Sequence, residues 1–206
     1  MPDKNKPSVP FTNNNQTLLH WCWAAIAANV YNSLRGLAPG HEGFKRPCDV
    51  AGLVLPPVPV DPATSPPTTI DPCSNEGIEK YDAERGLATA LDALHIRPKP
   101  LTTASPPDTV RARNRAKNPD LLATELKKKY PVCAEINWDA GGAHIVAISA
   151  VNNDVSHIWV EDPMLGPGDI LEYEYRDFRS NYEFQGNLES FQLVVKPNGG
   201  SSGRNP

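Results

Sequence analysis

Apolar residues recur at intervals of three and four along the first half of the chain, which is the spacing of amphipathic helices. The first stripe starts after Cys22, is followed by the helix-ending Gly36, and comprises Trp23, Ala27, Val30, Tyr31 and Leu34. Ser74 or Asn75 is placed to cap the next helical region. That region contains a second stripe of Leu87, Ala90, Leu91 and Leu94. The pattern therefore predicts a helical first half.

After Pro131 the pattern changes to short apolar or alternating runs, which are typical of β-strands. The runs are V-C-A-E-I-N-W, A-H-I-V-A-I-S-A-V, V-S-H-I-W-V-E-D, I-L-E-Y-E-Y and F-Q-L-V-V, with a short helical turn expected over 176–182. Just upstream, Asn118 and Pro119 predict a capped helix that reaches about Lys129. Short connections such as 152–154 favour antiparallel pairing. We therefore expect an α+β fold, helices first and an antiparallel sheet second, in one domain over 1–206.

Prolines divide the helical half. The segment 37–73 holds a dense group of them and is expected to be a long excursion without a long helix or a central strand. A second loop is marked by Pro98, Pro100, Pro106 and Pro107. Residues 1–15 are expected to lie extended on the surface, and the Gly-, Ser- and Asn-rich tail 196–206 to be flexible.

Charge and hydropathy exclude some functions. The net charge is −4 and the sequence pI is about 5.7, which argues against a nucleic-acid partner. The basic run 127–129 is expected to be a solvated helix end. No apolar stretch is long enough to span a membrane, and residues 1–10 lack the apolar core of a secretory signal. These features suit a cytoplasmic protein or one exported by a signal-independent route, and they leave the oligomeric state open.

The chain has four cysteines, at 22, 48, 73 and 133. Cys48 and Cys73 flank the proline-rich segment, and the sequence leaves open whether they form a disulfide or stay reduced. Cys133 lies in a strand-like run and is expected to be a small buried apolar residue. There is no C-x-x-C pair and the histidines are scattered, so we expect no metal site.

The strongest chemical signal is a cysteine at a helix start combined with a distant histidine and acid. A helix N-terminus and a neighbouring imidazolium both favour the thiolate that Cys22 would need as a nucleophile. His144 opens an apolar strand after Gly141 and Gly142, where small residues leave room for a substrate. Asp162 ends a later strand and could accept the second ring N–H of His144.

Other residues compete for these roles less well. His20 is too close in sequence to Cys22, His41 and His95 lie in or beside loops, and His157 lies in an exposed alternation. Asp139 is a weaker orienting acid than Asp162. Gln16, six residues before the cysteine, offers a side-chain amide that would form an oxyanion hole with the Cys22 backbone N–H.

This set resembles the papain-like cysteine peptidases. The match consists of Gln16, Cys22-Trp23, His144 and Asp162, and the forms C-W-A-A, G-G-A-H-I-V and V-E-D-P-M-L-G-P-G are similar to the staphopain-like and double-glycine-type bacterial branches. Leu19 stands where papain has a disulfide-forming cysteine, no propeptide is evident, and the segment 46–72 has no counterpart in the papain signature.

The resemblance implies a helical lobe and a sheet lobe with the active site in the cleft between them. It also implies a thiol peptidase that needs no cofactor and acts on protein or peptide substrates, with a possible role as an exported effector by family analogy. Two alternatives stay open. One is another thiol-dependent amide chemistry, such as glutamine deamidation, transglutamination or peptidoglycan amide cleavage. The other is an inactive papain-like binding module.

Overall fold

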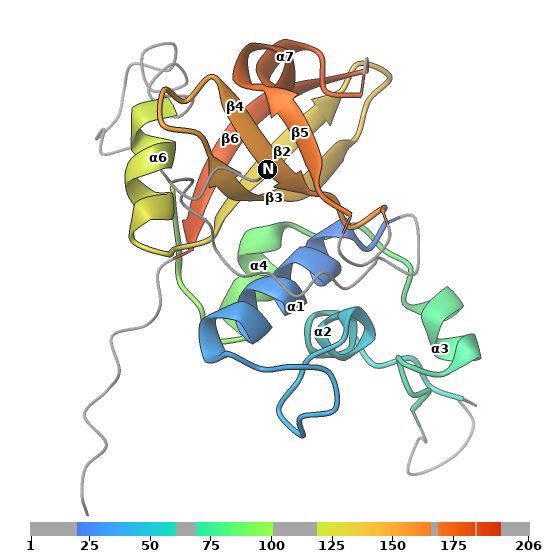
Figure 1. The fold of residues 1–206 in the computed structure, drawn as a ribbon. Coiled ribbons are helices and arrows are strands. Elements are labelled where there is room, and N and C mark those ends of the chain that lie inside the picture. Colours follow the sequence, from blue (N-terminus) through green and yellow to red (C-terminus); the bar gives the residue numbers. More distant parts are fainter. Residues whose placement is uncertain (1–19, 61–68, 101–118, 166–168, 184, 195–206) are drawn as a thin grey trace, which may run out of the picture.

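A computed structural model describes residues 20–60, 69–100, 119–165, 169–183 and 185–194. Four helices come first and the sheet follows (Figure 1). The helices are α1 (Cys22–Arg35), α2 (Pro47–Val54), α3 (Asn75–Lys80), α4 (Leu87–Ala93), α6 (Pro119–Lys127) and α7 (Tyr175–Ser180). The strands are β1 (Pro98–Pro100), β2 (Val132–Trp138), β3 (Ala143–Val151), β4 (His157–Glu161), β5 (Leu171–Glu174) and β6 (Gly186–Val194). The predicted α+β order is confirmed.

The helix boundaries follow local chemistry. Gly36 ends α1 in the left-handed conformation, with φ of 63°, and its N–H donates to carbonyls of the last turn. Ser74 caps α3 by accepting the N–H of Gly77 at 2.9 Å. Pro119 opens α6 as predicted, while its expected cap, Asn118, lies outside the described residues.

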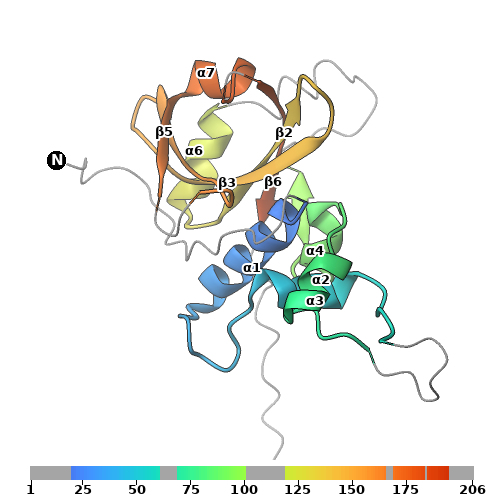
Figure 2. The ribbon, with the colours of Figure 1, turned by 90° about the vertical axis from the view of Figure 1, so that its right-hand side faces the viewer.

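All pairs in the sheet are antiparallel, in the order β1-β6-β2-β3-β4-β5. The sheet curls strongly, as Figure 2 shows, with α6 and α7 on its inner side and α1 and α4 against its outer side. The helix α2 packs on α1 and α4, away from the sheet. The alternation of β3 explains this arrangement, because Ile145 and Ala147 face the helices while Val146 and Ile148 face the inside of the curl. Both faces are buried, so β3 is apolar almost throughout.

Two short elements lie in the proline-rich parts of the chain. The helix α2 occupies the first part of the segment 37–73, and it ends at Val54, before the dense prolines begin. Strand β1 contains Pro98 and Pro100, which were expected in a loop, and this prediction was wrong. β1 is an edge strand that pairs on one side with β6, and an edge is where a sheet tolerates residues without an N–H.

The proline-rich excursion is fixed at both ends. A disulfide joins Cys48 in α2 to Cys73, just before α3. Between these ends, the hydroxyl of Tyr81 accepts the N–H of Val58 at 3.0 Å, and the N–H of Ile70 donates to Val58 O at 2.8 Å. Residues 61–68 lie outside the described part of the chain.

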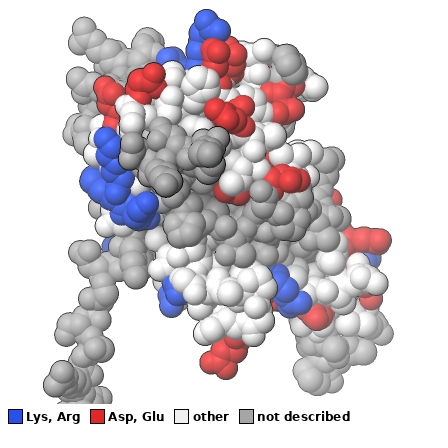
Figure 3. All heavy atoms as spheres, in the orientation of Figure 1, with Lys and Arg blue, Asp and Glu red and all other residues white. Residues whose placement is uncertain are grey.

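The surface in Figure 3 carries both signs of charge, with basic side chains gathered at its left edge beside α6. Lys127, Lys128 and Lys129 are exposed at the end of α6, and Lys128 pairs with Glu125 at 2.7 Å. They form the solvated helix end that the sequence predicted. Within the described ranges, no helix has the length and apolar character to cross a membrane.

Candidate active site

Cys22 is the first residue of α1, and its side chain faces the junction between the helices and the sheet. It is buried, with an exposed fraction of 7%, and it belongs to the core that α1 shares with Ile145 and Ala147. The first-turn N–H groups of the 14-residue helix leave partial positive charge at this end. The side chain of Cys22 therefore lies at the positive end of the helix.

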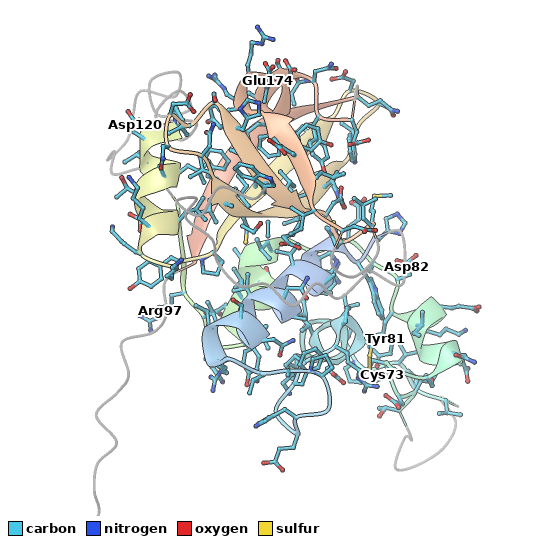
Figure 4. The ribbon with its side chains drawn as sticks, viewed as in Figure 1. Cys73, Tyr81, Asp82, Arg97, Asp120 and Glu174 are labelled. Atoms are coloured by element: carbon cyan, nitrogen blue, oxygen red, sulfur yellow. A yellow bond between two sulfur atoms is a disulfide. The ribbon has the colours of Figure 1, made fainter. Side chains whose placement is uncertain are left out.

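Two tryptophans fix the start of α1. The indole N–H of Trp21 donates to Tyr81 O at 2.9 Å, and that of Trp23 donates to Ala83 O at 3.0 Å. Both rings are almost fully buried. The segment that follows α3 therefore binds both neighbours of Cys22 in the sequence, Trp21 and Trp23. Figure 4 shows Tyr81 beside Cys73 in the helical half, below the start of α1.

His20 adds a third contact to the same segment. Its backbone N–H and its Nδ1 atom both lie near the carboxylate of Asp82, at 3.3 and 3.1 Å. His20 is thereby occupied with Asp82, which agrees with the expectation that it is not the base. Its ring still lines the cavity next to Cys22.

His144 is placed by the tight turn between β2 and β3. Gly141 and Gly142 have φ of 95° and 88°, values that favour glycine. The turn closes through the N–H of Gly141 on Trp138 O, at 3.0 Å, and the N–H of Trp138 on Gly142 O, at 3.1 Å. The indole of Trp138 stacks on the His144 ring with centroids 5.6 Å apart. Gly141 and Gly142 thus allow the turn to form, and the turn sets the position of His144.

Asp162 follows β4 directly and binds three donors. His144 Nε2 lies 2.9 Å from Oδ1, and the N–H of Met164 donates to the same oxygen at 2.8 Å. The hydroxyl of Tyr182 donates to Oδ2 at 2.6 Å. Asp162 and His144 are almost fully buried, with exposed fractions of 4% and 3%. The carboxylate is therefore held by hydrogen bonds in a place where water cannot replace them.

The electrostatics favour a protonated histidine. Burial opposes the charge on His144, but hydrogen bonds and charge interactions with Asp162 and Cys22 outweigh it and raise the pKa of His144 to about 9. Burial also opposes the charge on Asp162, and its contacts with His144 and Tyr182 nevertheless lower the pKa of Asp162. Since Nε2 faces Asp162, Nδ1 is the ring nitrogen left for the Cys22 thiol. The structure thus brings Cys22, His144 and Asp162 together in that order.

A cavity of about 360 Å³ opens beside the thiol. Cys22 and Trp23 line one side of it, Ala143 and Ile145 flank His144 on another, and residues 84–88 close it. Apolar atoms of Leu87 and Ile145 lie alongside charged groups of Glu84, Arg85 and Glu135. The cavity has room for a side chain of a bound molecule, and a neighbouring bond of that molecule would then lie next to the thiol of Cys22.

Other sequence candidates are not in the site. The carboxylate of Asp139 accepts from Asn187 at 2.7 Å rather than from His144, and the ring of His157 contacts Ser156 at 3.0 Å. Glu161 is buried and bonds to Ser149 rather than to His144. Gln16 lies outside the described residues, so its oxyanion role stays a prediction.

Possible metal ligands gather elsewhere. Within the described ranges, the group of His, Cys, Asp or Glu side chains close enough to share an ion is Cys48, Asp49 and Cys73. The two sulfurs of this group are bonded to one another, so neither is a thiolate ligand. The disulfide answers the question that the cysteine spacing left open.

Sequence reasoning missed two residues that touch the site, Trp138 and Tyr182. Trp138 ends a predicted strand, six residues before His144, so its place across the short turn 139–142, which holds two glycines, was a usable signal. Tyr182 closed the run expected to be a helical turn, and no local pattern links it to Asp162, 20 residues earlier.

No model of a known protein family matches the chain, and no curated protein matches its sequence.

Proposed function

We propose that this chain is a cysteine peptidase with a papain-like arrangement of its two halves. Cys22 is the nucleophile, His144 the base and acid, and Asp162 the residue that orients His144. The observation that carries the proposal is the position of a buried His144 between the thiol at the start of α1 and a carboxylate that binds three donors. A protonated His144 favours the thiolate beside it, which is the reactive form.

The reaction divides into two acyl transfers. The Cys22 thiolate adds to the carbonyl carbon of a peptide, and the carbonyl oxygen becomes an oxyanion. The C–N bond then breaks, the leaving amine takes the proton from His144, and a thioester remains. Water gives a proton to His144 and adds to the thioester carbon, and release of the acid restores the thiolate.

The oxyanion needs donors at the start of α1. The Cys22 backbone N–H is among the groups that an α-helix leaves without an intrahelical partner. The side-chain amide of Gln16 is the proposed second donor, and a donor of this kind contributes roughly 3 kcal/mol to the transition state. We therefore expect Gln16→Ala to lower kcat by about 100-fold, while leaving the alkylation of Cys22 intact.

The test is reaction of the full chain with an epoxysuccinyl inhibitor of cysteine peptidases, read by intact mass and peptide mapping. We expect one fast addition at Cys22 and its loss in His144→Gln. Cleavage of a peptide library then follows in the wild type only. No addition to a folded wild type under mild reduction would overturn the proposal. A gain of one dalton on glutamine-containing peptides, without cleavage, would instead assign the same thiol to side-chain amides.

A further inference from the structure

Asp162 has a short side chain on the loop that follows β4, and three contacts determine where its carboxylate points. Met164 N–H and His144 share Oδ1, whereas the hydroxyl of Tyr182 holds Oδ2. We propose that Tyr182 is a positioning residue of the catalytic site, which locks the Asp162 carboxylate toward His144 throughout the reaction. This inference rests on the proposed thiol chemistry and adds a fourth residue to it.

Tyr182 is held independently of Asp162. Its backbone N–H donates to Gly186 O at 2.8 Å, and it accepts the N–H of Gly186 at 2.9 Å. Its fully buried ring meets Phe178 edge-on, with centroids 5.5 Å apart, and contacts Tyr173 at 5.2 Å. The phenol is therefore a fixed point, and Asp162 is the partner that adjusts to it.

The hydroxyl stays a donor under all working conditions. Burial, followed by the charge of the Asp162 carboxylate, raises the pKa of Tyr182 far above the ordinary value for tyrosine. A protonated phenol at 2.6 Å from Oδ2 favours the carboxylate anion. The charge that faces His144 is thus retained when His144 gives up or regains its proton.

The turn that carries Tyr182 also supports His144 from the other side. Gly186 ends this turn and opens β6 opposite Trp138. A Cβ atom at Gly186 would lie 2.9 Å from Cε3 of Trp138, so the missing side chain lets the indole lie where it stacks on His144. Tyr182 therefore supports Asp162 directly, and Gly186 supports His144 through Trp138.

The experiment compares Tyr182→Phe with Tyr81→Phe. Tyr81 is a matched control, since it is almost as buried and its hydroxyl binds the backbone of the proline-rich excursion. Tyr81→Phe keeps the backbone carbonyl that accepts the indole N–H of Trp21, so the start of α1 is unaffected. Alkylation of Cys22 by iodoacetamide at pH 7 is followed by mass, with N-acetylcysteine as the reference thiol. This readout requires an activated thiol but no peptide substrate, and circular dichroism verifies the fold of each variant.

We expect Tyr182→Phe to slow alkylation by about tenfold, below the roughly 100-fold that a 1 Å misplacement can cost, and Tyr81→Phe to leave it unchanged. On a cleaved peptide, Tyr182→Phe should lower kcat and leave KM unchanged. In an Asp162→Asn background, Tyr182→Phe should add no further loss of rate, whereas a purely structural role would add its loss in full.

The outcomes separate the two proposals. A wild type no faster than N-acetylcysteine overturns the thiol chemistry, and the role of Tyr182 with it. A fast wild type with an equally fast Tyr182→Phe overturns the role of Tyr182 alone. If Tyr182→Phe does not fold, the hydroxyl proton of Tyr182 is followed by NMR in the wild type. It should shift when Cys22 is alkylated, and an unmoved resonance contradicts the positioning role.

Discussion

His144 Nε2 lies 2.9 Å from Asp162 Oδ1 in a place where both side chains are nearly excluded from water. Folding removes water from both side chains. The free-energy cost of this desolvation is offset only if every remaining polar atom of the pair finds a hydrogen-bond partner. Met164 and Tyr182 supply those partners for the carboxylate. Removing either member of the pair is then expected to leave an uncompensated buried group, so conservative variants are the useful ones.

The first prediction concerns pH and is made for Cys22→Ala, in which the thiol cannot titrate. His144 binds its proton more tightly in the folded chain, because Asp162 raises the pKa of the imidazole. The contribution of His144 to stability is then fully present below the unfolded value of about 6.5 and is lost as pH rises through the folded value. That folded value lies below the wild-type value of about 9, since the contribution of Cys22 is gone.

We expect urea unfolding of Cys22→Ala to show a fall in stability on the order of 1–2 kcal/mol between pH 6 and pH 9. Adding His144→Gln should remove this fall, and adding Asp162→Asn should reduce it. A stability that stays level in Cys22→Ala over this range would mean that Asp162 does not hold the proton on His144.

The second prediction concerns the disulfide between Cys48 and Cys73, which are separated by 25 residues. Closing a loop of this size restricts the unfolded chain, and its loss is expected to cost about 3 kcal/mol. The double variant Cys48→Ala, Cys73→Ala should unfold at lower temperature by calorimetry. Its alkylation rate at Cys22 should match the wild type at temperatures where both are folded. An unchanged melting temperature would show that other contacts fix the excursion.

The third prediction concerns Gly186. A methyl group there would come within 2.6 Å of Ile136 Cγ2 and would also press on Trp138. Gly186→Ala is therefore expected to cost about 1–3 kcal/mol by overpacking, and to slow alkylation of Cys22 by shifting the ring that stacks on His144. Gly43→Ala is the control, because its added atom would lie no closer than 3.4 Å to its neighbours. Equal stability of the two variants would contradict the prediction.

The fourth prediction concerns the cavity beside Cys22. Ala88→Trp places a large side chain on an exposed position that lines this cavity. It should raise KM for peptides without changing the rate at which iodoacetamide, a much smaller reagent, alkylates Cys22. Thr89→Trp is matched to it, since Thr89 is the exposed next residue of α4 and is not among the cavity-lining residues. An equal effect of both variants on KM would show that substrates bind elsewhere.

The parts of the fold that sequence predicted are those governed by local chemistry. Gly36 ends α1, Ser74 caps α3, and the strand runs after Pro131 all form strands of one sheet. The positions of Cys22 at a helix start and of His144 after a glycine turn were predicted in the same way, because both features are visible in a few consecutive residues.

The parts that sequence did not predict depend on distant partners. β1 exists because β6 pairs with it, and its prolines are tolerated only at that edge. Tyr182 reaches Asp162 because the curled sheet brings β4 and the residues before β6 together. Nothing in the sequence around Tyr182 or Asp162 indicates that the two are in contact, so this hydrogen bond is visible only in the three-dimensional structure.

Cys22 lies near the start of the described chain, and His144 follows it 122 positions later, with Asp162 later still. During synthesis the thiol therefore leaves the ribosome long before its base exists. A nascent or truncated chain that ends before β3 carries the nucleophile without the group that would activate it. Under the proposed chemistry, the cell that makes this protein is exposed to its activity only after β3 has folded against α1 and Asp162 has reached His144.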